Sequence, residues 1–144
     1  MRDATLEIAE NAFAEIAGRF PSLIQHRRPD DPVEISIEIP EQPGLKHRVW
    51  LALQNGDELT LGIGAVFQTE WFPCTKPEKV DRYIAAVTGF LSGEFRVVAF
   101  LRDGRCVKAR LEQPTGHAWR TVGYWARPRA LWPFGAERLV VQNA

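Results

Sequence analysis

Apolar side chains recur every three or four residues at the start of the chain, which is the spacing of one face of an α-helix. Asp3 can cap the first turn, and Pro21 ends the pattern because proline cannot continue a helix. The apolar positions are Leu6, Ala9, Phe13, Ile16, Ala17 and Phe20. The sequence therefore predicts an amphipathic helix over residues 3–20.

A second helical pattern follows Thr75. Thr75 and Glu78 fit the T-x-x-E capping box, in which each side chain accepts a hydrogen bond from a free backbone N–H. Pro77 is tolerated in the first turn, and Gly93 has the place of the residue that follows a helix. The apolar positions between them are Val80, Tyr83, Ile84, Val87 and Leu91. We expect a helix over residues 76–92.

Alternating apolar and polar residues predict strands in the first half of the chain. Residues 33–39 read V-E-I-S-I-E-I, which indicates a strand with one buried and one wet face. Asn55 and Gly56 predict a two-residue hairpin turn, because a type I′ turn requires positive φ at both central residues. Such a turn pairs Leu53 with Glu58 and sets the register of the two flanking strands.

The second half of the chain contains a further hairpin pattern around Asp103 and Gly104. A two-residue turn at this point places Phe100 on the same face as Ala109 and Leu111. The strand before the turn is apolar on both faces, which indicates a central position in a sheet.

The segment W-R-T-V-G-Y-W alternates as another strand, with Trp119 and Trp125 expected on one face. The residues R-L-V-V-Q-N close the chain with a short strand. The element order is then α-β-β-β-α-β-β-β, with a last β at the end. We predict an α+β protein of one domain, residues 1–144, with two main helices packed on one mostly antiparallel sheet of about six strands.

Composition narrows the classes of function. The chain of 144 residues has 18 Lys and Arg against 18 Asp and Glu, so its net charge is zero. A nucleic-acid binder usually shows a basic excess, because release of counterions from phosphates drives its affinity. We therefore expect no nucleic-acid partner.

The cysteines and the hydropathy pattern indicate the cellular compartment in which the protein is expected. Only Cys74 and Cys106 are present, far apart in the sequence, which favours free thiols in a reducing compartment over a disulfide scaffold. Acidic residues interrupt the N-terminal segment, and no apolar run reaches the roughly 20 residues that span a bilayer. The sequence thus predicts a cytoplasmic protein with no membrane contact.

Residues 70–78, E-W-F-P-C-T-K-P-E, raise the question of a reactive thiol. The strand after the first hairpin is expected to continue to Trp71, and Cys74 then lies just before a helix, whose positive end lowers a thiol pKa. The alternative is a small buried residue in an aromatic corner, and the sequence favours it. In the functional reading, a pocket between the sheet and the second helix is lined by Gly62, Gly64, Trp71 and Cys74. Such a pocket would make the protein a small-molecule binder or a minor enzyme.

Other catalytic patterns are missing from the sequence. The three histidines and two cysteines have no metal-ligand spacing, and G-I-G at 62–64 lacks the lysine and the helix of a phosphate loop. We therefore expect no metal, no cofactor and no catalytic residue.

Five tryptophans in a chain rich in arginine form the most unusual feature. Trp50 is assigned to the core by its strand pattern. Tryptophan and arginine are the residue types most enriched in interface hot spots, although tryptophans also fill small cores. The candidate binding residues are Trp71, Cys74, Trp119, Trp125, Arg127 and Trp132. The sequence thus favours a non-enzymatic binding protein whose partner is another protein or a second copy.

The run E-L-T-L-G-I-G-A-V-F-Q-T-E-W-F, then a helix, then a strand ending in D-G-R, has a recognisable layout. Over residues 58–112 it resembles small α+β bacterial proteins of the immunity type, which bind and neutralise toxins. The resemblance is one of layout and assigns no functional residue. It implies a binding function directed at another protein.

Overall fold

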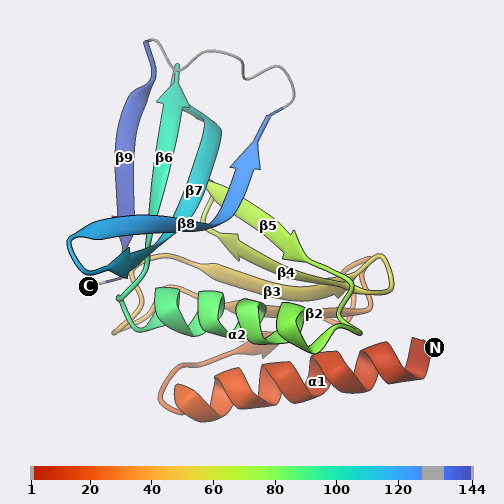
Figure 1. Ribbon diagram of the computed structural model, residues 1–144. Helices are drawn as coiled ribbons and strands as arrows, with labels where there is room; N and C mark the ends of the chain where they lie inside the picture. Colours follow the sequence, from red (N-terminus) through yellow and green to blue (C-terminus); the bar gives the residue numbers. More distant parts are fainter. Residues whose placement is uncertain (1, 128–134, 144) are drawn as a thin grey trace.

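The computed structural model describes residues 2–127 and 135–143, which form two helices and two antiparallel sheets (Figure 1). The five-stranded sheet has the order β1-β2-β3-β4-β5, and the four-stranded sheet has the order β8-β7-β6-β9. The elements are α1 (Arg2–Arg19), β1 (His26–Arg27), β2 (Ile35–Ile39), β3 (Val49–Gln54), β4 (Glu58–Ile63), β5 (Phe67–Trp71), α2 (Pro77–Leu91), β6 (Arg96–Arg102), β7 (Arg105–Thr115), β8 (Ala118–Ala126) and β9 (Glu137–Gln142). The α+β class is confirmed, and the single sheet of six strands is wrong.

The turn at Gly64 adds a strand to the five-stranded sheet that the sequence did not predict. This residue has a φ of 52°, and the N–H of Val66 bonds back to the carbonyl of Ile63, so the chain reverses. The segment that ends at Trp71 is therefore β5, a separate strand antiparallel to β4 rather than its continuation. Because α2 then carries the chain across the core, the next hairpin starts a new sheet.

The core lies between the five-stranded sheet and the two helices, which both cover the same face of that sheet (Figure 1). Tyr83 of α2 is fully buried there, and its hydroxyl donates a 2.7 Å hydrogen bond to the carbonyl of Thr60. Its ring meets Phe13 and Trp71 edge to face. The four-stranded sheet joins the same core through residues that include Val97, Ala99, Ala109 and Leu111.

Both hairpin registers differ from the sequence prediction. Three residues separate Gln54 from Glu58 in the first turn, so Leu53 pairs with Leu59. In the second hairpin Leu101 pairs with Cys106 as expected, but a bulge next to Phe100 shifts the pairing by one residue. Because each shift of one residue exchanges the two faces of a strand, Phe100 lies on the face opposite to the core.

The helix ends confirm some local predictions and correct others. Helix α1 begins at Arg2, so Asp3 lies in its first turn. Helix α2 has Lys76 as its N-cap with no side-chain hydrogen bond, so the capping box is wrong, while proline does begin the helix. Gly93 has a φ of 83° and donates to the carbonyl of Phe90, which confirms its place after the helix. In the described part of the chain, neither helix is long and apolar enough to cross a membrane.

Candidate functional site

The corner at residues 70–78 is part of the core. Trp71 is 8% exposed and Cys74 only 1% exposed. The backbone N–H of Cys74 donates to the carbonyl of Asp57 at 2.9 Å, which ties the corner to the β3–β4 turn. Burial, and then the carboxylate of Asp57, raise the pKa of the Cys74 thiol. An activated thiol needs a lowered pKa, so the burial and the raised pKa of Cys74 favour a buried structural residue over a reactive thiol.

The pocket expected between the sheet and α2 is not formed by the residues proposed for it. The ring of Tyr83 occupies that space. Gly62 faces the other side of the sheet, where a Cβ atom would lie 3.5 Å from the Trp50 side chain. Cys74 instead lines a groove of about 300 Å³ between α1 and α2, together with Ile8, Ala12, Val80 and Ile84.

The charges of the chain are divided between its two parts. Residues 94–144 contain nine Lys and Arg against four Asp and Glu, a net charge of +5. Residues 1–93 contain nine Lys and Arg against fourteen Asp and Glu, a net charge of −5. In this acidic part, burial and then the carboxylate of Glu58 raise the pKa of Glu70. A net charge of zero thus conceals an acidic N-terminal part and a basic C-terminal part of the sequence, and the latter contains the strands of the four-stranded sheet.

Arg96, Lys108 and Arg110 bring three of the nine cations in residues 94–144 to the outer face of the four-stranded sheet. Strand register and side-chain contacts place six residues there, on the side opposite to the core residues of the same strands. We call this surface the cationic–aromatic face. Its members are Arg96, Phe100, Lys108, Arg110, Trp119 and Tyr124.

A buried acid organises the cationic–aromatic face. Glu112 is 6% exposed, and it accepts hydrogen bonds from Arg96 at 2.8 Å and from Arg110 at 3.0 Å. Both arginines use their Nε atoms, so the terminal nitrogens of each guanidinium have no such bond to Glu112. Two cations on one anion leave a net positive charge. A guanidinium with free terminal donors is suited to a carboxylate or phosphate of a ligand.

The cations are also held by aromatic rings. The guanidinium carbon of Arg96 lies 3.9 Å from the centre of the Trp119 ring. Lys108 and Arg110 lie over Phe100, at 4.8 Å and 5.6 Å from its ring centre. Trp119 and Tyr124 keep 38% and 57% of their surface exposed. Because cation–π contacts and ion pairs fix the side chains before binding, little conformational entropy is lost when a ligand arrives.

The structure separates the candidate residues that the sequence grouped together. A bulge between Leu111 and Glu112 breaks the alternation of side chains along β8. As a result Trp119 lies on the outer face, whereas Trp125 packs against the core. Arg127 lies beside Trp125, 5.9 Å from its ring centre, and its Nε donates to the carbonyl of Cys106. Trp132 lies outside the described residues. Trp71 and Cys74 belong to the core, so Trp119 alone of the described candidates is part of the cationic–aromatic face.

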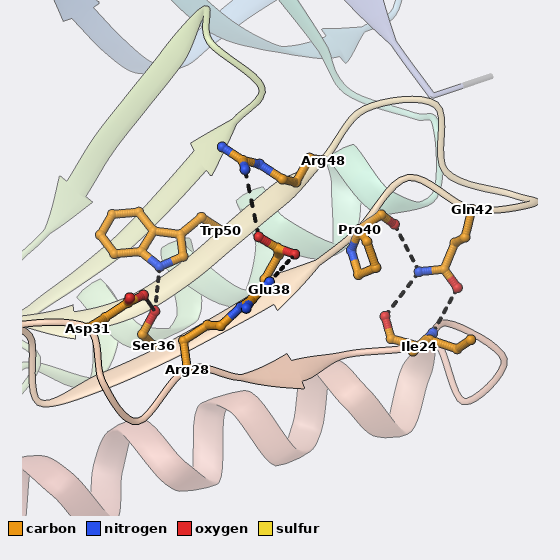
Figure 2. Close-up of polar contacts among 9 residues, drawn as sticks. All are labelled: Ile24, Arg28, Asp31, Ser36, Glu38, Pro40, Gln42, Arg48 and Trp50. Atoms are coloured by element: carbon orange, nitrogen blue, oxygen red, sulfur yellow. Dashed lines mark hydrogen bonds and ion pairs between the residues drawn. The ribbon is translucent and has the colours of Figure 1, made fainter.

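The outer face of the five-stranded sheet carries a second polar cluster, shown in Figure 2. The indole N–H of Trp50 donates to the Ser36 hydroxyl at 2.7 Å, and this hydroxyl donates to Asp31 at 2.6 Å. Trp50 is therefore half-buried on the side away from the helices, which corrects its assignment to the core. No histidine bridges the serine and the acid in these contacts, so the hydroxyl lacks an activating base.

The remaining groups of Figure 2 satisfy one another. Glu38 accepts a 2.7 Å bond from Arg28 and forms a longer ion pair of 3.7 Å with Arg48. The Gln42 amide donates to the carbonyls of Ile24 and Pro40 and accepts from the Ile24 N–H. These bonds fasten the loops around β2, and the cluster has the character of a structural network.

The chain matches no family model, no curated protein and no solved structure. Within the described residues no group of three or more His, Cys, Asp and Glu side chains is placed to hold a metal ion. The cationic–aromatic face combines cations whose terminal donors are not bonded to Glu112 with aromatic rings that hold them in place.

Proposed function

We propose that this protein is a non-enzymatic binding protein, and that its cationic–aromatic face receives an acidic segment of a partner protein. The observation that carries the proposal is the arrangement around Glu112, where Arg96 and Arg110 are fixed against aromatic rings. Arginine held beside tryptophan and tyrosine is the composition of an interface hot spot. The positive charge of this part of the chain also steers a negatively charged partner toward it.

A protein partner fits this face better than a nucleic acid. Proteins that bind single-stranded nucleic acids stack bases on aromatic rings. Here Arg96 covers Trp119, and Lys108 and Arg110 cover Phe100. Bases would have to displace these cations, whereas carboxylates bind to the cations where they are. An immunity-type role, in which the acidic partner is a toxin, is one form of this function, and we place the protein in the cytoplasm because both cysteines are free.

The proposal is tested with two fluorescent probes of equal charge, a peptide of alternating glutamate and tyrosine and an oligothymidylate. Fluorescence anisotropy should show salt-dependent binding of the peptide. The double variant Lys108→Glu, Arg110→Glu should weaken this binding at least about tenfold, since it reverses two charges of the face. Lys76→Glu is the control, because Lys76 is an exposed cation at the N-cap of α2.

Two results would overturn the proposal. Equal peptide affinity of the wild type and the double variant would show that the face does not bind acidic segments. Tighter binding of the oligothymidylate, lost in the double variant, would replace the protein partner by a nucleic acid.

The groove between α1 and α2 supports a second candidate, a small apolar ligand. Its volume of about 300 Å³ is at the lower limit of ordinary ligand sites, and its lining combines aliphatic side chains such as Val80 and Ile84 with the polar side chains of Asn11, Glu15 and Asp81. Val80 is only partly buried in it, so Val80→Trp should fill the groove without opening the core. The candidate predicts that anilinonaphthalene sulfonate fluoresces with the wild type and that Val80→Trp removes this signal. A signal unchanged by the substitution would eliminate it.

A further inference from the structure

Strand β9 forms an edge of the four-stranded sheet. Its only sheet neighbour among the described residues is β6. Two large apolar side chains of β9 are exposed, Leu139 and Val140, each at 41%. They lie on opposite faces, because Leu139 pairs with Ala99 of the core face and Val140 pairs with Val98 of the outer face. An edge strand that is apolar on both sides is a template for another strand.

The other three sheet edges are short or covered. Strand β1 has two residues, and Arg27 of this strand is bonded to Glu10 of α1. Strands β5 and β8 are edges of different sheets that lie against each other, with the Thr69 hydroxyl donating to the carbonyl of Tyr124 at 3.1 Å. In the described part of the chain, β9 is thus the one long edge whose outer side is free to pair.

We propose that β9 pairs antiparallel with β9 of a second copy of this chain, about a two-fold axis that passes beside Val140. With this register Val140 meets Val140 of the second copy, Leu139 meets Val141, and Arg138 meets Gln142. Apolar residues then face apolar residues, and the cation faces an amide.

The sequence of β9 selects this register. The two faces of the sheet stay matched only if the axis passes beside a residue, and Leu139 is the other central choice. An axis beside Leu139 sets Arg138 against Val140 and Glu137 against Val141, so that two charges face apolar side chains. Self-pairing about Val140 avoids both mismatches, and it places no like charges directly opposite each other.

The pairing would give one continuous sheet of twice the width. A two-fold axis perpendicular to a sheet keeps the same face of both copies on the same side, so the two cationic–aromatic faces would form one surface. This inference uses only the edge of β9 and does not rest on the proposed binding function. If both hold, a partner with two acidic segments binds with an avidity that one copy does not provide.

Light scattering and sedimentation equilibrium test the pairing on the full chain. The wild type should reach twice the chain mass of 16.3 kDa as its concentration rises to about 1 mM, the range in which a small interface associates. Val140→Lys and Val140→Glu should each raise the dissociation constant at least about tenfold, because each places like charges opposite each other at the axis. An equimolar mixture of the two variants should recover the dimer through opposite charges.

The control is Ile24→Lys, which replaces an exposed apolar residue outside the sheets. Circular dichroism establishes that every variant is folded before its mass is measured. A wild type that stays monomeric at about 1 mM, or variants that dimerise like the wild type, would overturn the pairing. A mixture that stays monomeric would overturn the register at Val140. Peptide binding to the cationic–aromatic face is measured separately. Loss of dimerisation does not exclude peptide binding, and loss of peptide binding does not exclude dimerisation.

Discussion

Arg96 joins Trp119 to Glu112: its guanidinium carbon lies 3.9 Å from the centre of the tryptophan ring, and its Nε donates to the buried carboxylate at 2.8 Å. The two residues it joins come from neighbouring strands, β8 and β7, so one side chain of β6 ties three strands together. Arg96 itself is largely buried by these contacts. The contacts within the cationic–aromatic face thus also stabilise the four-stranded sheet.

Replacing Glu112 by glutamine should lower the free energy of unfolding by about 1–3 kcal/mol, because two arginines lose their charged partner in a largely buried place. Urea unfolding followed by circular dichroism measures the loss. The control is Glu15→Gln, which breaks an exposed pair with Arg19 and should cost less than about 0.5 kcal/mol. Equal losses in the two variants would contradict a structural role for Glu112.

Replacing Tyr83 by phenylalanine should destabilise the protein by about 1–2 kcal/mol, since the carbonyl of Thr60 loses its buried donor. Burial also raises the pKa of Tyr83 well above its ordinary value of 10.0. The unfolded chain then releases this proton at a lower pH than the folded protein, so stability falls as the pH rises above the ordinary value. Urea unfolding at neutral and alkaline pH should show this fall in the wild type and a smaller one in Tyr83→Phe. A fall of equal size in both would exclude Tyr83 as its source.

Replacing either of two helix glycines by alanine should change the stability of the protein, in opposite directions at the two positions. A Cβ atom at Gly89 of α2 would lie 2.6 Å from the ring of Phe95, whereas one at Gly18 of α1 would meet nothing within 4 Å. Gly89→Ala should therefore cost about 1–3 kcal/mol through overpacking. Gly18→Ala should gain up to about 1 kcal/mol, because alanine favours a helix more than glycine. Thermal unfolding of the pair measures both effects, and a stabilising Gly89→Ala would show that Phe95 moves freely.

The thiol of Cys74 should react slowly in the folded protein, because it is 1% exposed and its pKa is raised. Its reaction with a disulfide reagent should follow unfolding of the chain and speed up with urea. Cys106→Ala isolates this thiol for the measurement. Fast reaction of the folded Cys106→Ala protein would reopen the question of a functional thiol. The raised pKa also means that Cys74 contributes stability that is lost as the pH rises through the ordinary thiol value.

Periodicity predicted both helices, and the turn residues Asn55-Gly56 and Asp103-Gly104 predicted the two hairpins, because a helix face and a turn depend on residues close in sequence. The reversal at Gly64 was missed because G-I-G-A-V-F carries no proline or asparagine, and the glycine followed a strand pattern without a break. Missing this turn merged β4 and β5, two neighbouring strands of the five-stranded sheet, into one expected strand. The separation of the four-stranded sheet depends on pairing between distant strands, such as β6 with β9, which local patterns do not encode.

The candidate site was harder to predict, because its composition depends on bulges. One bulge next to Phe100 and another beside Leu111 move aromatic residues from one face to the other, and neither bulge has a signal in the residue types. Trp119 was predicted as a binding residue only because tryptophan is enriched in interfaces. The three cations of the cationic–aromatic face, Arg96, Lys108 and Arg110, belong to the basic C-terminal part of the chain, which the net charge of the whole sequence does not reveal.

The division of charge gives this electrically neutral chain an acidic N-terminal part, residues 1–93, and a basic C-terminal part, residues 94–144, and therefore a permanent dipole between them. A molecule of this kind feels no net force in a uniform field, but it feels a torque. Near an acidic partner it rotates before it touches, so most encounters begin with the basic C-terminal part in front. Salt at physiological strength confines this alignment to separations of about 8 Å, which makes the final approach the step that selects orientation.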